Sequence, residues 1–212
     1  MILSEADARD YVGQFADKAA MERLDWLASA LIEENQKQNL ISKPSEQQIW
    51  QRHIADSVQL LRFVPRETWE DGDAGSWLDL GTGAGFPGLI IAAIAPNLPI
   101  FLVESRRRRA DWLEQMASEM KLRKCEIKGR RLEMIAPFPV KTISARAFAP
   151  LPKLLSLSAP FSTEDTVYLL PKGRSAAQEL AQMPESGGLQ KRSMFHVEQS
   201  LTDSEAGIIV SN

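Results

Sequence analysis

The residues best suited to chemistry in this sequence lie in a glycine-rich segment at 79–88, Asp-Leu-Gly-Thr-Gly-Ala-Gly-Phe-Pro-Gly. A short apolar run precedes the segment. Pro87 suits the first turn of a helix, because the N–H that proline lacks would be unpaired there anyway. Glycine has no Cβ, so Gly81, Gly83 and Gly85 allow a tight turn and a close approach to a ligand. A strand, a glycine loop and a helix in this order predict a site for a nucleotide-containing cofactor.

Two acidic residues flank this loop at positions that suit such a cofactor. Asp79, just before the glycines, can accept hydrogen bonds from a cationic amino group. Nineteen residues after Gly85, a second apolar run at 99–103 ends at Glu104. A carboxylate at the end of the second strand is suited to bind both hydroxyls of a ribose. The first strand, the glycine loop, the helix, the second strand and the acid at its end together make a stronger signal than the glycines alone.

Two cofactors compete for this loop. Residues 83–88 match G-x-G-x-x-G, the pattern of nicotinamide-dependent oxidoreductases. Asp79, however, would repel a pyrophosphate and attract the ammonium group of an aminoacyl cofactor. Gly88 would lie inside the helix, and the chain after Glu104 is short for a separate substrate domain. These points favour S-adenosylmethionine, and the nicotinamide cofactor stays as the alternative.

Composition narrows the class of protein. The chain has 212 residues, 44% of them hydrophobic, and a net charge of −3. One cysteine excludes an internal disulfide, and with only two histidines we expect no metal site. The start of the chain does not resemble a signal peptide, and the longest apolar run, 89–95, is too short to cross a bilayer. We therefore expect a cytoplasmic protein with no membrane partner.

Positive charge gathers in one stretch of this slightly acidic chain. From 106 to 131 there are ten lysines and arginines against four acidic residues. Four of them lie at a predicted helix start. Positive charge there is unfavourable because it is repelled by the helix dipole, which costs about 0.3–1 kcal/mol per residue. A phosphate-binding side is one interpretation, and a solvated face has about equal weight. The four candidates for RNA binding are Arg106, Arg107, Arg108 and Arg109.

From residue 76 onward, short apolar runs alternate with helical stretches, which is typical of an α/β fold with a mostly parallel sheet. Two further runs, 193–199 and 207–210, predict an antiparallel hairpin at the edge of the sheet. The predicted strands lie near 76–80, 99–104, 124–128, 141–146 and 165–171, and the predicted helices at 87–95, 106–120, 149–158 and 174–183.

The first part of the chain, 1–66, is predicted to be a helical extension packed on a core domain at 67–212. A helix is expected to restart after Pro44, with Ser45 and Gln48 as a capping box. Residues 67–75 are expected to form a loop. His53 and Asp56 share one helical face. From the residues alone, the favoured interpretation of His53 is a buried histidine that braces this helix.

The chain resembles a known family, the bacterial 16S ribosomal RNA guanine-N7 methyltransferases, once called glucose-inhibited division protein B. The resemblance runs from about residue 20 to the C-terminus. It implies a Rossmann-like class I methyltransferase fold with N-terminal helices, S-adenosylmethionine as cofactor, and methylation of N7 of one guanine. The segments that carry it are 39–42, Arg52-His53-Ile54-x-Asp56-Ser57, 79–88, Glu104-Ser105, 144–149 and 170–173.

The resemblance also suggests roles for single residues. It implies that Gly81, Phe86, Leu132–Glu133 and Arg146 bind the cofactor. It raises the chance that the helix face of His53 borders the active site. His53 and Arg146 are then candidates for organising the site.

The chemistry of N7 methylation agrees with the sequence. N7 already holds a lone pair, so the enzyme needs to align the base and the methyl group and needs no general base. Methylation of a pyrimidine carbon would need a cysteine nucleophile. Cys125, the sole candidate, lies in a strand expected to be buried. No Asn/Asp-Pro-Pro-Tyr motif, typical of exocyclic-amine methyltransferases, follows the fourth strand.

Lys172 and Arg174 follow the fifth strand, at the edge of the sheet where ligands bind, and are further candidates for RNA contacts. The expected partner is 16S ribosomal RNA, naked or in the 30S subunit, and the protein is expected to be a monomer. A small-molecule methyltransferase, a nicotinamide-dependent oxidoreductase and a non-catalytic ribosome-binding protein remain as alternatives.

Overall fold

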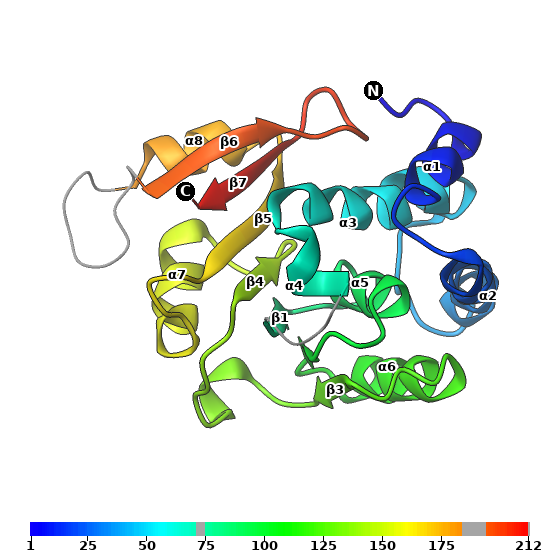
Figure 1. Ribbon diagram of the computed structural model, residues 1–212, viewed down its shortest axis with the longest axis horizontal. Helices are drawn as coiled ribbons and strands as arrows, with labels where there is room; N and C mark the ends of the chain where they lie inside the picture. Colours follow the sequence, from blue (N-terminus) through cyan, green and yellow to red (C-terminus); the bar gives the residue numbers. More distant parts are fainter. Residues whose placement is uncertain (71–74, 184–193, 212) are drawn as a thin grey trace.

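The computed structural model describes residues 1–70, 75–183 and 194–211 (Figure 1). A seven-stranded sheet in the order β3-β2-β1-β4-β5-β7-β6 forms its centre. The first five strands are parallel, β7 runs antiparallel to β5, and β6 pairs with β7. This confirms the predicted α/β class with its C-terminal hairpin. The strands are β1 (Trp77–Leu80), β2 (Ile100–Val103), β3 (Cys125–Lys128), β4 (Thr142–Ala145), β5 (Val167–Gly173), β6 (Phe195–Gln199) and β7 (Gly207–Ser211).

Strand β1 lies in the middle of the parallel part and all four of its side chains are buried, as expected for a strand covered on both faces. Leu80 at its end pairs with Val103 of β2 and with Ala145 of β4. The carboxyl ends of these strands therefore meet at one edge. Strand β3 is different, because no strand covers its outer side and its residues are half-exposed or exposed. The expectation of a buried third strand is wrong.

The sheet is covered by helices on both faces. Buried residues of α5, α6 and the N-terminal helices form one hydrophobic cluster, and those of α7 and α8 belong to a second. The four helices predicted after residue 86 are confirmed, each shorter than predicted. The α-helices are α1 (Glu5–Val12), α2 (Lys18–Asn35), α3 (Asp56–Val58), α4 (Arg66–Glu70), α5 (Gly88–Ile94), α6 (Arg107–Glu119), α7 (Leu151–Ser158) and α8 (Ala176–Ala181).

Two local expectations for the first seventy residues are wrong. The segment after Pro44 begins with a 3₁₀ turn, η1 (Lys43–Gln48), and the Ser45 hydroxyl donates to the carbonyl of Ser42 at 2.8 Å, so no capping box forms. The segment expected as a loop contains α4. This helix forms because Trp69 is buried in the hydrophobic cluster that α5, α6 and the N-terminal helices share. Residues 71–74 of that expected loop lie outside the described residues.

The N-terminal region packs against the α5 side of the sheet. Leu24 and Leu31 of α2 are buried in the same cluster as Ile90 of α5. The side chain of Arg23 donates a hydrogen bond from Nε to the carbonyl of Ala93 at 2.8 Å. After α2, the chain passes through η1 into η2 (Trp50–Ala55), α3 and η3 (Gln59–Phe63), a nearly continuous helical run. In the part of the chain that the structure describes, no helix is long and apolar enough to cross a membrane.

A buried carboxylate joins the central strands to the first helix of the core. Asp79 has no exposed surface. Its Oδ2 accepts a hydrogen bond from the backbone N–H of Gly88 at 3.0 Å, and its Oδ1 accepts one from the Ser144 hydroxyl at 2.7 Å. The Ser144 oxygen in turn accepts from the indole N–H of Trp77 at 2.7 Å. Burial raises the pKa of the Asp79 carboxyl above its ordinary value of 3.8.

This shift predicts a pH-dependent stability difference between the protein and its Asp79→Asn variant. A carboxyl whose pKa is raised by folding stabilises the fold fully below the unfolded value near 3.8. That contribution is lost as the pH rises through the folded pKa, by about 1.4 kcal/mol per unit of difference between the two values.

Urea unfolding of both proteins between pH 4 and 8 measures this difference. The free energy of unfolding of the unmodified protein, relative to Asp79→Asn, is expected to fall as the pH rises. A difference that grows with pH would show that the folded state favours the charged carboxylate.

Candidate functional site

The glycine-rich loop lies at the carboxyl edge of the sheet, between β1 and α5. The backbone N–H groups of Gly81 and Thr82 donate to the carbonyl of Val103, at 2.8 and 3.1 Å, and so attach the loop to the end of β2. Gly81 and Gly83 have φ angles of +66° and +62°, in the left-handed region that favours glycine. The loop therefore makes the tight turn that the sequence predicted, with Gly81 and Gly83 half-buried.

The two glycines face different surroundings. A Cβ on Gly81 would lie 2.6 Å from Cδ2 of Phe148, so a protein side chain already packs against this residue. A Cβ on Gly83 would meet nothing nearer than Nη1 of Arg109, at 3.7 Å. The backbone at Gly83 is thus open to a ligand, with a guanidinium close by. This arrangement fits the aminoacyl and nucleoside parts of S-adenosylmethionine.

The other predicted cofactor residues follow the same edge. Glu104 comes directly after β2 and is nearly buried, with Oε1 accepting from the backbone N–H of Arg106 at 2.8 Å. Leu132 and Glu133 lie in the short helix η4 (Leu132–Met134) after β3, the first buried and the second exposed. The structure brings these residues to the edge where the glycine loop lies.

Asp79 differs from its predicted role at the ligand. Its buried carboxylate bonds to groups of the protein on both oxygens, so it presents no surface to a ligand's ammonium group. It holds the loop by linking β1 to the first residue of α5. Pro87 also differs slightly from expectation, since it caps α5 and Gly88 is the first helical residue.

His53, which belongs to η2 of the N-terminal region, lies against the glycine loop. Its ring stacks on Phe86 with the centroids 4.7 Å apart and the planes 10° from parallel. Its Nδ1 is 3.3 Å from Nη1 of Arg146. Burial, aided by the positive charges of Arg146 and Arg52, lowers the pKa of His53 to about 3. The imidazole is therefore neutral at physiological pH, and Nδ1 accepts the Arg146 hydrogen bond.

Arg146 stands at the end of β4, where three groups hold its guanidinium. Besides His53, these are Oδ2 of Asp56, 3.7 Å from Nη1, and the carbonyl of Arg52, which accepts from Nη2 at 3.4 Å. The next residue, Ala147, has a φ of +53°, a left-handed conformation that strains a residue with a Cβ by about 1–2 kcal/mol. Such strain is found most often at functional sites.

A cavity of about 1030 Å³ opens beside these residues. Its walls come from the segment after β4, the end of β5, the N-terminal helices and the 200–207 region. Phe148, which packs on Gly81, is part of the wall, so the cavity adjoins the glycine loop. The volume matches the upper end of ligand sites, about 300–1,000 Å³. Within 1–70, 75–183 and 194–211, no cluster of three or more histidine, cysteine, aspartate or glutamate residues could hold a metal ion.

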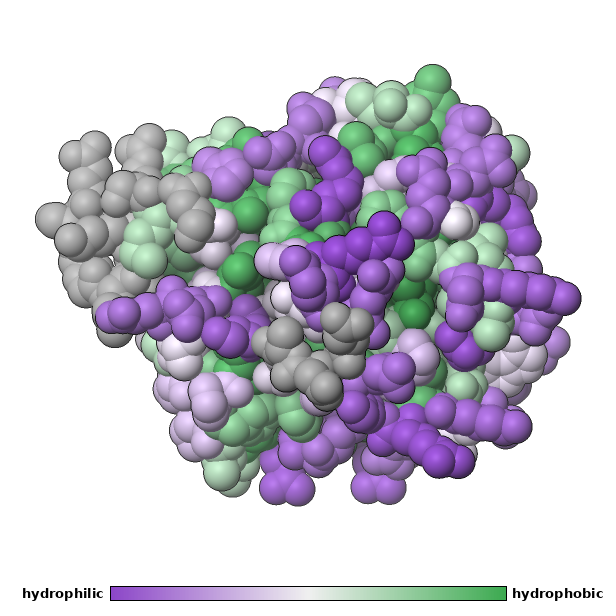
Figure 2. Space-filling model, in the orientation of Figure 1, coloured by the Kyte–Doolittle hydropathy of each residue, from purple (hydrophilic) through white to green (hydrophobic). Residues whose placement is uncertain are grey.

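The four arginines at the start of α6 differ in their contacts. Arg107 pairs with Asp111 at 2.8 Å. Arg108 and Arg109 donate to the carbonyls of Lys37 and Asn39, at 3.4 and 3.2 Å, and so attach the connector after α2 to the core. Arg106 is exposed at the N-cap. Figure 2 shows mainly hydrophilic side chains on the side of the molecule where α6 and β3 lie.

The two candidates after β5 are already paired. The Lys172 side chain is only 6% exposed, with Nζ 2.9 Å from Oε2 of Glu179, and it donates to the carbonyl of Ala149 at 2.8 Å. These contacts pair the ammonium group of Lys172 with groups of the protein at the wall of the cavity. Arg174 is exposed and forms an ion pair with Glu205.

Cys125 lies away from this site, because it opens β3 at the opposite, amino edge of the sheet. Burial raises the pKa of its thiol to about 12, which makes it a poor nucleophile. The geometry agrees with the structural role predicted for this residue.

Sequence reasoning missed three parts of the site. These are Phe148 on Gly81, the position of Arg109 beside Gly83 (it was predicted only as an RNA-binding residue), and the 200–206 turn as a wall of the cavity. Two of them had a weak signal, since Phe148 and Arg109 lie within segments that were already singled out. The turn had none, because its contacts with residues 51–59 span more than 140 positions.

Solved structures share this architecture. A ribosomal protein L11 methylase from Lactobacillus delbrueckii subsp. bulgaricus superposes with a TM-score of 0.54 and 13% identity, covering 74% of this chain and 77% of that one. Aeropyrum pernix fibrillarin, solved with natively bound S-adenosyl-L-methionine, gives a TM-score of 0.52 and 14% identity, covering 76% and 75%. At these identities the likeness shows the fold, which is the predicted class I methyltransferase fold.

Sequence comparison is more specific. A model of the family described as rRNA small subunit methyltransferase G matches residues 20–206. Ribosomal RNA small subunit methyltransferase G from Erythrobacter litoralis is 55% identical over 210 residues, covering 99% of this chain and 97% of the relative. The protein of the same name from Novosphingobium aromaticivorans is 49% identical over 211 residues, covering 99% and 88%. With the glycine loop and its surroundings in place, this chain belongs to the rRNA small subunit methyltransferase G family.

Proposed function

We propose that this protein transfers the methyl group of S-adenosylmethionine to N7 of a specific guanine in 16S ribosomal RNA, with the cofactor on the glycine loop and the guanine in the adjoining cavity. The observation that carries these positions is the contact of Phe148 with Gly81, which joins cavity and loop. The chain is an S-adenosylmethionine-dependent methyltransferase by family and fold, as predicted.

The residues around the cavity suit a transfer that moves no proton to the enzyme. When bound, S-adenosylmethionine would supply a methyl group on a positively charged sulfur; the N7 lone pair would bond to the methyl carbon as the carbon–sulfur bond breaks, and S-adenosylhomocysteine would leave. Neutral His53, with a pKa of about 3, takes up no proton at physiological pH, and none has to be removed. The protein's task is to hold the base and the cofactor in line. His53 and Arg146 are proposed to organise the site.

The RNA chain outside the cavity is proposed to contact the exposed arginines at the start of α6, above all Arg106 and Arg107. Both lie near the carboxyl edge of the sheet, where the guanine would enter. Arg108 and Arg109 contribute mainly by holding the N-terminal connector. An RNA acceptor of this kind supports a cytoplasmic location, and we propose that the protein acts there as a monomer.

The test of the proposed function is transfer of a labelled methyl group from S-adenosylmethionine to 16S ribosomal RNA, with nucleotide-resolved mapping of the product. Naked RNA and 30S subunits are compared. One N7-methylguanine is expected, in one or both substrates. Cofactor binding without transfer to either substrate would contradict the proposed acceptor and favour a small-molecule substrate.

The glycine loop generates a paired prediction. Gly83→Ala puts a methyl group into the space proposed for the cofactor, without a protein clash, so S-adenosylmethionine affinity should fall at least tenfold. The melting temperature should fall only slightly, because a left-handed alanine costs about 1–2 kcal/mol. Calorimetric titration and thermal unfolding measure the two effects.

Gly81→Ala is the matched control, since its Cβ would meet Phe148 at 2.6 Å. It should lower both the affinity and the melting temperature, the latter more than Gly83→Ala does. Unchanged cofactor affinity in Gly83→Ala would remove the loop from the binding site.

The exposed arginines generate a prediction about salt dependence. Arg106→Ala and Arg107→Ala should each weaken binding to 16S RNA and reduce the slope of log K against log salt by roughly one, because each removes about one phosphate contact. Cofactor affinity should not change.

Arg123→Ala serves as the charge-matched control. Arg123 is exposed but precedes β3, at the opposite edge of the sheet. The change should alter neither the affinity for RNA nor the salt slope. Equal effects of all three substitutions would mean that RNA responds only to net charge.

A further inference from the structure

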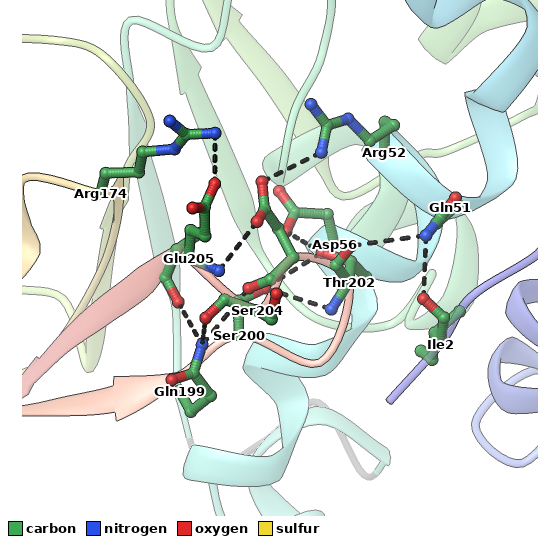
Figure 3. Close-up of polar contacts among 12 residues, drawn as sticks. Ile2, Gln51, Arg52, Asp56, Arg174, Gln199, Ser200, Thr202, Ser204 and Glu205 are labelled. Atoms are coloured by element: carbon green, nitrogen blue, oxygen red, sulfur yellow. Dashed lines mark hydrogen bonds and ion pairs between the residues drawn. The ribbon is translucent and has the colours of Figure 1, made fainter.

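The turn that joins β6 to β7, residues 200–206, forms a buried polar network with the N-terminal helices (Figure 3). The Thr202 hydroxyl donates to Oδ1 of Asp56 at 2.7 Å and lies 3.0 Å from the Ser200 hydroxyl. The Gln59 amide donates to that Ser200 oxygen at 3.2 Å and accepts from the backbone N–H of Leu201 at 2.8 Å. Gln59, Ser200 and Thr202 are all buried.

Further contacts, with the N-terminus and with two arginines, hold the same turn in place. The backbone N–H of Ile2 donates to the carbonyl of Leu201 at 2.7 Å. The Gln51 amide donates to the carbonyl of Ile2 at 2.9 Å and to that of Thr202 at 3.4 Å. Asp203 and Glu205 of the turn pair with Arg52 and Arg174, which extend toward it in Figure 3. The turn is therefore attached to both the N-terminus and the segment after β5.

Asp56 divides its two carboxylate oxygens between this turn and the site. Oδ1 accepts from Thr202 and, at 2.8 Å, from the Gln59 amide. Oδ2 lies 3.7 Å from Nη1 of Arg146. Rotation of the carboxylate would break both hydrogen bonds to Oδ1, so Thr202 of the turn, together with Gln59, determines the direction in which Oδ2 points.

Arg146 depends on this carboxylate for its position. Among the residues described, Asp56 is the only acidic group that forms an ion pair with Arg146. The other two contacts are a neutral ring nitrogen at 3.3 Å and a backbone carbonyl at 3.4 Å. Arginine loses about 2 kcal/mol of side-chain entropy when it is ordered, and a positive Arg52 lies nearby, so a fixed carboxylate is needed to hold the guanidinium here.

We infer that Asp56 and Thr202 are positioning residues of the methyl-transfer site. The Thr202 hydroxyl orients the Asp56 carboxylate, and the carboxylate holds the Arg146 guanidinium beside His53, where the cavity adjoins the cofactor loop. This inference rests on the proposed role of Arg146. It gives the C-terminal hairpin a function in the reaction, although no residue of the hairpin belongs to the glycine loop or its strands.

The first test compares Thr202→Val with Thr202→Ser in the full-length protein. Valine has the shape of threonine without the hydroxyl, and serine retains the hydroxyl. Displacement of a positioned group by about 1 Å can reduce a rate about 100-fold, so Thr202→Val should lower kcat for methyl transfer to 16S RNA by roughly 10- to 100-fold. Thr202→Ser should remain within about twofold of the unmodified protein. Equal rates in both variants would overturn the inference.

A second variant keeps the test valid if Thr202→Val folds poorly. Asp56→Asn can retain the oxygen that accepts from Thr202 and Gln59, and it places an uncharged amide toward Arg146. It should lower kcat as Thr202→Val does, while the melting temperature stays close to that of the unmodified protein. A normal kcat in this variant would overturn the inference.

A double-mutant cycle separates positioning from a general loss of structure. Arg146→Ala should lower kcat/KM, and adding Thr202→Val should lower it no further, because the group being positioned is already gone. Multiplied losses would show that Thr202 acts independently of Arg146 and would overturn the inference. If Arg146→Ala alone has no effect, the proposed role of Arg146 fails. If it has a large effect and Thr202→Val has none, only the positioning role fails.

Discussion

The buried carboxylate of Asp79 joins three elements on which the site depends. One oxygen binds the Ser144 hydroxyl of β4, and the other binds the first backbone N–H of α5. The glycine loop runs from the strand that carries Asp79 to the helix that this carboxylate binds, so one buried group holds both ends of the loop. Burial raises the pKa of this carboxyl. A group with no exposed surface can be kept in this position because donors from the protein replace water around both oxygens.

The proposed cofactor site and the cavity lie on two sides of this junction. The carboxyl ends of β1, β2 and β3 present the loop, Glu104 and Leu132–Glu133 on one side, as open α/β sheets generally do. The segment after β4, with Arg146 and Phe148, borders the cavity on the other side. Phe148 on Gly81 is the point of contact between them. Loop and cavity therefore adjoin through a direct packing contact.

Electrostatics at the boundary favour a site without an enzyme base. Burial, aided by the positive charges of Arg146 and Arg52, lowers the pKa of His53 and keeps its imidazole neutral. The Arg146 guanidinium pairs with Asp56, whose other oxygen belongs to the network of the β6–β7 turn. The C-terminal hairpin is thus linked to Arg146 through Asp56 of the N-terminal region.

The sequence alone determined the elements whose signals are local. The strand and helix ranges, the glycine loop, the acid after β2 and the family motifs depend on neighbours a few positions apart. Expectations failed where longer-range packing decides: α4 forms because Trp69 is buried, and β3 is half-exposed at the sheet edge. Only the tertiary structure joined Thr202 to Asp56 across 146 positions and buried Asp79 completely. A hydrogen bond between distant residues leaves no periodicity in the sequence, because its partners are set by how the whole sheet and its helices pack.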